Sequence, residues 1–371
     1  DGFKLFSYLN CDLPDSLDID HDRAQSVDYL IPPNFTAEGV LLTLVLDLDE
    51  TLIYNRLLNG RILRVPILRP FLIPFLLSIP HHQVEVVVWT ASTSATARHV
   101  VSYILHQVKT LVSALHATTR AQSSQCSQQE NTHLIDHVIA RNSLWFLSPE
   151  TEMSSSDVPR VTVSYHTKDL RHLGRDLGGV ILVENSYHCP KLQPQNSVIV
   201  KDFHAMNSDY SLHSGFLDPE EPTVESLLDE YYCFQSLLEH FSDPNRRNEP
   251  DQSICARCKT PLREHQKDMT LVSLALLVRE TVRRRSSATK RPRVTDILQQ
   301  MADENFPIQS AQTKSQPTGT QSFLMNFLGI PAPVSPTHFQ SLNSRINAPI
   351  HGSYYELPRE LFGEAPGRNT V

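Results

Sequence analysis

The sequence lacks an apolar run long enough to cross a membrane. The longest run, Phe71 to Ile79, contains Pro74 and is about half of the roughly 20 residues that a transmembrane helix needs. We therefore expect no membrane span in this chain. Because the chain starts at Asp1 rather than at methionine, the sequence carries no information about a leader peptide.

Cysteine and excess charge of one sign are also scarce. The 371 residues include six cysteines, which are too scattered for a disulfide framework, so we expect a reducing compartment. With 41 acidic and 33 basic residues the net charge is -8, which argues against the whole chain being a nonspecific binder of polyanions. The chain contains no internal repeat, and its length is sufficient to bury a full core, so folding need not depend on metals or disulfides.

Uninterrupted aliphatic runs predict the buried strands of a parallel sheet. These runs are LLTLVLDLD at 41–49, VEVVVWT at 84–90, VILVEN at 180–185 and the shorter VIV at 198–200. Apolar residues at helical spacing place helices between them, at 70–79 and 94–115. Strands that alternate with helices predict a three-layer, Rossmann-like α/β/α fold with right-handed crossovers.

Changes in composition divide the chain into three parts. Residues 1–38 are read as an N-terminal extension, 39–242 as the α/β domain and 243–371 as a C-terminal region. Within the domain, the polar segments 117–133 and 148–158 are predicted to be loop insertions. The C-terminal region contains a predicted amphipathic helix at 269–284 and a basic segment. From about 303 it becomes a low-complexity tail with no packed core of its own.

Chemistry is concentrated where the first predicted strand ends, in the sequence DLDET. Ligands of open α/β sheets bind beyond the carboxyl ends of the strands, which is where Asp47 and Asp49 are expected. Residues two apart on an extended chain point the same way, so we expect the two carboxylates to approach each other. A hard divalent cation such as Mg²⁺ would relieve their repulsion. The alternative is that DLDET is a solvated turn between a strand and a helix.

Four motifs in order resemble one known family. They are LVLDLDETLI at 44–53, ILRPFLIPFL at 67–76, VEVVVWTAS at 84–92 and YHTKDLRHLGRDLGGVILVENS at 165–186. Together they are similar to the haloacid-dehalogenase superfamily, and within it to the FCP/SCP-like phosphatases that act on the C-terminal domain of RNA polymerase II and to their small relatives. The resemblance covers about residues 40–240, and it implies that 39–242 is an FCP/SCP-like phosphatase domain.

The resemblance implies a role for each matching residue. Asp47 would be the nucleophile that takes the phosphoryl group, and Asp49 the general acid and then the base. Thr90 would hold a phosphate oxygen, and Lys168 would neutralise the transferred charge. Mg²⁺ would be bound by the Asp47 side chain, the Asp49 backbone carbonyl and the Asn185 side chain. Taken alone, Thr90 would be an ordinary strand end and Lys168 a solvated charge.

Other positions are expected to support the site or depart from the family pattern. Thr51 and Glu184 are expected to lie just behind the metal-binding residues. Glu184 stands where the family has aspartate, and its extra methylene is expected to weaken activity rather than abolish it. Arg175 is expected to be structural, paired with Asp176 or Asp169. Further departures are Tyr187 in place of proline, a long segment between Thr90 and Lys168, and a short flap between Thr51 and Arg69.

Two weaker signals lie in the C-terminal region. Cys255 and Cys258 form a lone CxxC pair followed by His265, which fits either a zinc site or free surface thiols. The basic segment 279–293 fits a nuclear localisation signal, a contact with RNA or a solvated face. Apart from this segment, we expect no binding of nucleic acid.

The resemblance predicts a Mg²⁺-dependent phosphatase that acts on phosphoserine or phosphothreonine in a protein or peptide. The C-terminal domain of RNA polymerase II is one candidate substrate, and the nucleus the corresponding location. The alternative is a scaffold on the same fold, such as the receptor subunit of the mitochondrial import translocase, which KLQPQN at 191–196 also resembles. A third possibility is phosphotransfer on a small metabolite.

Overall fold

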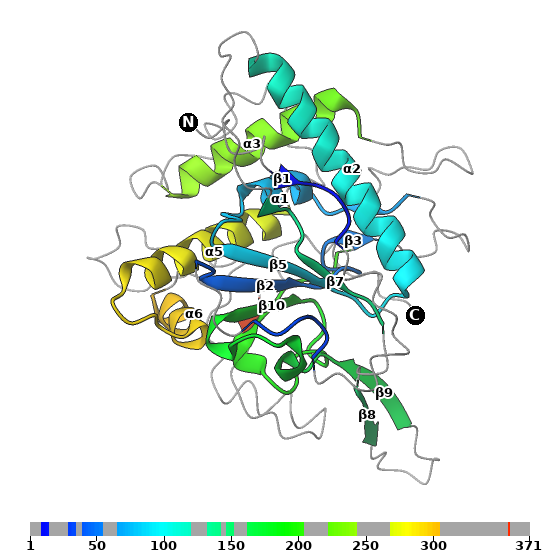
Figure 1. Ribbon diagram of the computed structural model, residues 1–371, viewed down its shortest axis with the longest axis vertical. Coiled ribbons are helices and arrows are strands. Elements are labelled where there is room, and N and C mark those ends of the chain that lie inside the picture. The colour runs from blue at the N-terminus through cyan, green and yellow to red at the C-terminus, as the bar shows by residue number, and fades with distance from the viewer. Residues whose placement is uncertain are drawn as a thin grey trace, which may run out of the picture.

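The computed structural model describes part of the chain, and all structural statements below concern that part. The described residues are 9–14, 29–34, 39–54, 65–119, 132–141, 146–151, 162–203, 222–242, 268–304 and 355–356. They form one parallel sheet with helices packed against it, together with three small two-stranded pairings (Figure 1).

The central sheet has six strands in the order β12-β11-β10-β2-β5-β7, and every neighbouring pair is parallel. The strands are β2 (Leu42–Leu46), β5 (Val84–Trp89), β7 (His137–Ile139), β10 (Val180–Glu184), β11 (Ser197–Ile199) and β12 (Tyr355–Glu356). All four strands predicted from aliphatic runs are present, which confirms the α/β class and the parallel sheet. The three central strands are buried on both faces because helices or irregular chain cover each side.

Helices cover one face of the sheet (Figure 1). They are α1 (Leu72–Ser78), α2 (Ser94–Thr119), α3 (Val224–Ser242), α5 (Thr270–Ser287) and α6 (Val294–Asp303). Leu44, Val86 and Ile181 point from the sheet into this core, and residues of all five helices join the same apolar cluster. Residues 268–304, which the sequence analysis assigned to the C-terminal region, therefore share the core of the sheet domain.

The opposite face of the sheet has a smaller apolar cluster. Val45, Val87 and Leu182 point into it, as the alternation along a strand requires. The cluster is covered by Ile31 and by the 3-10 turns η5 (Leu170–Leu173) and η6 (Leu177–Gly179). Part of the predicted N-terminal extension thus belongs to the domain, since Ile31 is buried there.

Three smaller pairings complete the sheet structure. They join β1 (Leu9–Asn10) to β6 (Thr132–His133), β3 (Ile53–Tyr54) to β4 (Ile67–Leu68), and β8 (Phe146–Thr151) to β9 (Thr162–Thr167). The polar segment 148–158 was predicted to be a loop, but residues 148–151 belong to β8. The error arose because Ser148 and Pro149 disfavour a strand locally, whereas pairing with β9 supplies the backbone hydrogen bonds. The 3-10 turn η7 (Pro194–Asn196) precedes β11.

The basic segment 279–293 is largely involved in intramolecular contacts. Arg285 is buried and donates to the carbonyls of Gly178 and Pro292. Arg284 pairs with Glu280 and Glu304, which joins α5 to the end of α6. These side chains stabilise the folded domain, so an extended localisation signal would have to rely on the exposed residues around Lys290.

Three further sequence predictions concern membrane spans, cysteines and the zinc site. No helix among the described residues is long and apolar enough to span a membrane. Cys11, Cys189 and Cys233 form no disulfide bonds among the described residues. The CxxC pair at 255–258 and residues 120–131 of the first predicted insertion lie outside the described residues, so the zinc site stays a prediction.

Arg175 is structural, but its partner is not the one predicted. Its guanidinium makes a bidentate ion pair with Glu85 on β5, with Nη2 to Oε1 at 2.5 Å and Nε to Oε2 at 2.8 Å. It also donates to the carbonyl of Pro32, 2.7 Å away. Sequence proximity suggested Asp176 or Asp169, whereas the fold brings Arg175 to the start of the strand that ends at Trp89.

Replacing Glu85 with glutamine should destabilise the protein by about 2–3 kcal/mol at pH 7. Although burial raises the pKa of Glu85, hydrogen bonds from His137 and Arg175 lower it to about 2, against an ordinary value of 4.5. The carboxylate therefore contributes stability above pH 4.5, and this contribution is lost as the pH falls towards 2. Urea unfolding of wild type and Glu85→Gln at pH 7, 5 and 4 should show a difference that shrinks in acid. A difference independent of pH would contradict this assignment.

Candidate active site

The candidate residues directly follow three adjacent strands, so they lie together at the carboxyl end of the sheet. Asp47 follows β2, Thr90 follows β5, and Asn185 follows β10. From β2 the chain continues to β5 and β7 on one side of the sheet, whereas β10 and β11 lie on the other side of β2. The strand order therefore reverses next to β2. Such a switch point is where open α/β sheets form their binding crevices.

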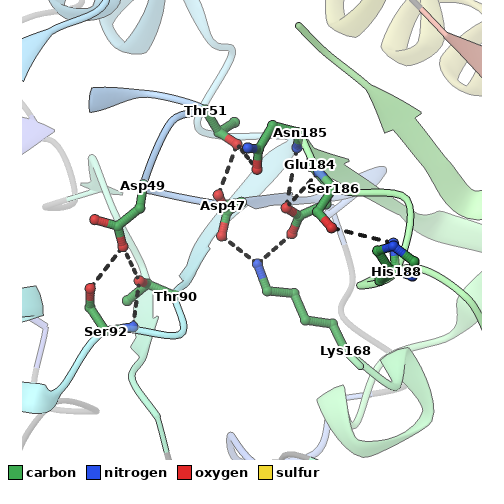
Figure 2. A network of polar contacts seen from close by, with 10 residues as sticks. All are labelled: Asp47, Asp49, Thr51, Thr90, Ser92, Lys168, Glu184, Asn185, Ser186 and His188. Atoms are coloured by element: carbon green, nitrogen blue, oxygen red, sulfur yellow. Dashed lines mark hydrogen bonds and ion pairs between the residues drawn. The ribbon is translucent and has the colours of Figure 1, made fainter. Parts of the chain in front are cut away.

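Asp47 is held by donors from both sides (Figure 2). Its backbone N–H continues the ladder by donating to the Val183 carbonyl, 3.0 Å away. Lys168 Nζ lies 2.5 Å from Oδ1, and the Thr51 hydroxyl donates to Oδ2 at 2.8 Å. The residue is 6% exposed, so one narrow side of this carboxylate remains accessible.

Lys168 is a fully buried cation placed between two carboxylates. Besides Asp47, its ammonium contacts Glu184 Oε2 at 2.7 Å, and its backbone N–H donates to the Cys189 carbonyl at 2.8 Å. Burial opposes its charge, but the two carboxylates outweigh burial and raise its pKa. Burial and the charge of Glu184 raise the pKa of Asp47 to about 7, against the opposing effect of Lys168. Two carboxylates and one ammonium leave one net negative charge in a buried site.

Glu184 uses its extra methylene to reach Lys168. While Oε2 contacts the ammonium, Oε1 accepts from the backbone N–H groups of Asn185 and Ser186, both at 3.2 Å. The departure from aspartate is thus accommodated by a complete set of partners. Through these two contacts, Glu184 fixes the backbone that carries the Asn185 amide.

Asp49 has different partners from Asp47. Its Oδ2 accepts from the hydroxyls of Thr90 at 2.9 Å and Ser92 at 2.8 Å. The strand β2 ends at Leu46, so the alternation of an extended chain does not by itself set the directions of Asp47 and Asp49. Glu50, with φ of 60°, then turns the chain in the left-handed region, a strained conformation that is common at functional sites.

The orientation of the Asn185 amide is fixed by its two neighbours. Its Nδ2 donates to Asp202 at 3.2 Å, and its Oδ1 lies 3.2 Å from the Thr51 hydroxyl. A carboxylate can only accept, so the amide nitrogen must face Asp202. The carbonyl oxygen is consequently turned towards the side of Thr51 that also faces Asp47.

The donors and acceptors at this edge fit a hard cation. The Thr51 hydroxyl has a single hydrogen, yet it faces oxygens of both Asp47 and Asn185. Together with the excess negative charge, this leaves more oxygen acceptors than donors, and Mg²⁺ prefers oxygen ligands with several waters. Among the described residues, no three His, Cys, Asp or Glu side chains gather as a metal cage. A magnesium site here would rely on one carboxylate, one amide and one backbone carbonyl.

Two residues of this arrangement were missed from the sequence. Ser92 lies two positions after Thr90 and shares its acceptor, and its own N–H donates to the Thr90 hydroxyl at 3.0 Å. Asp202 follows β11 and meets Asn185 only because β10 and β11 are neighbours. The signal for Ser92 was present in the motif VEVVVWTAS, whereas nothing in the sequence pointed to Asp202. The buried neighbour Trp89 belongs to the core, as predicted.

Replacing Ser92 with alanine should lower the turnover number by about 10-fold with little change in stability. The substitution removes one of two hydroxyls that hold the Asp49 carboxylate. Thr90 still donates to the same oxygen, so the low end of the range for a hydrogen bond to a charged group, about 1.5 kcal/mol, applies. Steady-state kinetics and urea unfolding measure the two effects. Thr93→Ala is the control for activity. It removes a hydroxyl that contacts Thr96 at the start of α2 but makes no hydrogen bond to Asp49 among the described residues, so its turnover number should match wild type even if losing this helix cap lowers stability.

Comparisons with known proteins agree with the sequence resemblance. Residues 42–220 match the model of the NLI interacting factor-like phosphatases. TIM50-A of Drosophila melanogaster, a mitochondrial import inner membrane translocase subunit, is 31% identical over 117 residues, which are 30% of this chain and 34% of that protein. The chain thus spans about a third of the length of that curated relative.

Among solved structures, two of the RNA polymerase II CTD phosphatase Fcp1 each align over 71% of both chains with 15% identity and a TM-score of 0.31. One of them is the fission yeast protein bound to beryllium fluoride. A TM-score this low does not support the fold, which instead follows from the parallel sheet described above. The family match and the order of the motifs along β2, β5 and β10 place residues 42–220 in the NLI interacting factor-like phosphatase family.

Proposed function

We propose that this chain hydrolyses phosphoserine or phosphothreonine in proteins, with Asp47 as the nucleophile and Mg²⁺ as the cofactor. The observation that carries the proposal is the buried Asp47 carboxylate, paired at 2.5 Å with the ammonium of Lys168 at the switch point of the sheet. A carboxylate in this position is suited to attack phosphorus, while the ammonium offsets the charge of the transferred group. The family match supports phosphatase chemistry.

The reaction proceeds in two displacements. An oxygen of Asp47 forms a bond to phosphorus as the bond to the seryl or threonyl oxygen breaks, and Asp49 gives its proton to that leaving oxygen. Water then attacks the phosphorus of the aspartyl phosphate and gives a proton to Asp49, which releases inorganic phosphate and restores Asp47. In the free protein the Thr90 hydroxyl donates to Asp49. When substrate enters, this hydroxyl would instead donate to a phosphate oxygen.

The hydrogen bonds of Asp49 suit its double role. Both hydroxyls, from Thr90 and Ser92, approach the same oxygen, Oδ2, so the transferred proton is best carried by Oδ1. The two donors hold the side chain in one orientation while it changes protonation state. Asp49 therefore acts as an acid in the first step and as a base in the second without moving.

The magnesium ion would be held by the Asp47 carboxylate, the Asn185 carbonyl oxygen and the Asp49 backbone carbonyl. When bound, it supplies positive charge that offsets the phosphate oxygens in the transition state. The chain prepares this site through Asp202, which orients the amide, and through Glu184, which fixes the backbone of Asn185.

Trapping the covalent intermediate tests the proposed function. Wild type is mixed with a ³²P-labelled phosphoserine peptide and Mg²⁺, quenched in acid and digested. The label should lie on the peptide that contains Asp47, be released by hydroxylamine as expected of an acyl phosphate, and be absent in EDTA. Label on a serine or histidine, or no label despite Mg²⁺-dependent turnover, would exclude Asp47 as the nucleophile.

The substrate class is tested separately. The sequence resemblance proposes phosphopeptides of the RNA polymerase II C-terminal domain, with the nucleus as the location. A panel of such peptides, unrelated phosphoserine and phosphothreonine peptides and sugar phosphates should show preference for peptides. Faster hydrolysis of sugar phosphates would favour a metabolite phosphatase instead.

The identity with TIM50-A favours a second candidate function. On this proposal the domain serves as a receptor or scaffold in mitochondrial protein import, and the polar site is retained for binding or stability. The two candidates differ in turnover: the scaffold predicts no Mg²⁺-dependent hydrolysis of an aryl phosphate above solvent background. Its location would be the mitochondrion, which imaging of the full-length protein distinguishes from the nucleus.

A further inference from the structure

Arg69 joins two loops of the candidate site through its buried guanidinium. The residue is 1% exposed, and it lies just before α1. Its Nη1 donates to the Thr51 carbonyl at 2.8 Å, and its Nη2 donates to the Lys201 carbonyl at 3.0 Å. The guanidinium also lies over the Phe203 ring, 5.6 Å from its centroid. One planar group thus spans the loop after β2 and the loop after β11.

These two loops bracket the proposed metal ligands. The Thr51 hydroxyl faces Asp47 and Asn185, while Asp202, next to Lys201, orients the Asn185 amide from the other side. The two loops also contact each other directly. The Phe203 N–H donates to the Glu50 carbonyl at 2.6 Å. The separation set by Arg69 therefore decides how the carboxylate and amide oxygens converge.

Arg69 is held in turn by the first turn of α5. Its Nε pairs with Asp268 Oδ2 at 2.8 Å, and its Nη2 donates to the Thr270 hydroxyl at 2.9 Å. Asp268 has a second role, since its Oδ1 accepts from the backbone N–H of Thr270, the first residue of α5, at 3.0 Å. The orientation of the guanidinium is thereby coupled to the start of α5, which lies outside the family match of 42–220.

We propose that the first turn of α5 positions the metal-binding half of the active site through Arg69, which makes Arg69, Asp268 and Thr270 positioning residues of the reaction. The expected effects on metal affinity and turnover rest on the proposed function. The expected effect on the positions of the two loops does not. The family domain alone would then be incomplete. Its site loops need a helix supplied by a later part of the chain.

The planar guanidinium group explains why arginine is required at position 69. All three nitrogens of the guanidinium donate, in fixed directions, to partners in three separate segments. A lysine ammonium is a point charge and cannot reproduce this planar arrangement. Arg69→Lys should therefore loosen the two loops although the charge is retained.

The decisive comparison uses two threonines on the same helix, in the full chain. Thr270→Val removes the hydroxyl that accepts from Arg69. Thr281→Val removes a hydroxyl that is also buried in α5 but has no hydrogen-bond partner among the described residues, so it is the matched control. Asp268→Asn keeps an acceptor for the Thr270 N–H while it removes the charge that Arg69 faces.

Three measurements are made on each variant at a temperature where all are folded. Hydrogen exchange followed by mass spectrometry should show faster exchange in peptides covering 47–54 and 198–203 for Thr270→Val and Asp268→Asn. Calorimetric titration with Mg²⁺ should show affinity weaker by about 10-fold, the effect typical of residues that support metal ligands. The turnover number should fall with little change in KM for an aryl phosphate. Thr281→Val should match wild type in all three.

Equal exchange in Thr270→Val and Thr281→Val, or a change confined to α5, would overturn the proposal. The test does not depend on the enzyme assay. If wild type shows no Mg²⁺ binding or turnover, the proposed function fails, while the exchange of the two loop peptides still decides whether α5 positions them.

Discussion

Asp47→Asn is expected to abolish Mg²⁺-dependent turnover of an aryl phosphate, by at least about 10⁴-fold, while making the metal-free protein more stable. Activity is lost because an amide is not a nucleophile towards phosphorus. Stability rises because Asp47 and Glu184 share the single ammonium of Lys168, and the substitution removes the surplus negative charge. An effect in opposite directions on activity and stability is typical of a functional residue held in an unfavourable environment.

The fold has room for the amide at this position. Lys168 can only donate, so the carbonyl oxygen of the new amide would face the ammonium and its NH₂ group would face Thr51. The Thr51 hydroxyl can accept from that group and donate to Asn185, 3.2 Å away, so no polar atom loses its partner.

The stability arm of this prediction is measured by urea unfolding in EDTA at pH 8. We expect a gain of about 1–3 kcal/mol, since burial and Glu184 raise the pKa of Asp47 to about 7 and its charged form is disfavoured at higher pH. The gain should shrink as the pH falls below 7, because wild type then binds a proton. Mg²⁺ should stabilise wild type more than the variant. A variant that is less stable in EDTA at pH 8 would show that the carboxylate is structural.

The fold could be predicted from the sequence where one residue type dominated a segment. Aliphatic runs such as 84–90 indicated strands because burial on both faces favours this composition. The helix α6 was not predicted. It is short, and it follows a basic segment that contains proline and was interpreted as a candidate nuclear localisation signal. Its apolar residues, including Val294 and Leu298, reveal the helix only when the core is known.

For the candidate site, too, local sequence patterns could be used for prediction, whereas contacts between distant segments could not be predicted. Residues inside short motifs, such as Asp47, Thr90 and Lys168, could be proposed as site residues because a motif preserves their spacing. Contacts between distant segments were not found. Arg69 and Asp268 are 199 positions apart, and their pairing depends on how α5 packs against α1. The contacts of Asp49 with Thr90 and Ser92 were also not found, because they join the segment after β2 to the segment after β5.

Lys168→Met is expected to destabilise the metal-free protein by about 3–5 kcal/mol at pH 8, the penalty for leaving a buried charge without its partner. Methionine fills a similar space without strain, so lost packing contributes little. The variant leaves Asp47 buried without its ammonium partner, and a lower pH lets Asp47 take up a proton. The destabilisation should therefore be larger at pH 8 than at pH 6. Turnover should fall by about 10²–10³-fold, since a charge-stabilising donor is removed.

A second substitution separates the electrostatic cause from a loss of packing. Adding Glu184→Gln to Lys168→Met removes one of the two uncompensated carboxylates and should recover much of the lost stability, without restoring turnover. Lys109→Met is the matched control, because Lys109 pairs with Asp12 at 2.9 Å but both side chains are more than half exposed. This exposed pair is screened by water, so the urea midpoint should not change. If Lys168→Met is no less stable than Lys109→Met, the buried ammonium does not compensate the two carboxylates, and the charge assignment of the site is wrong.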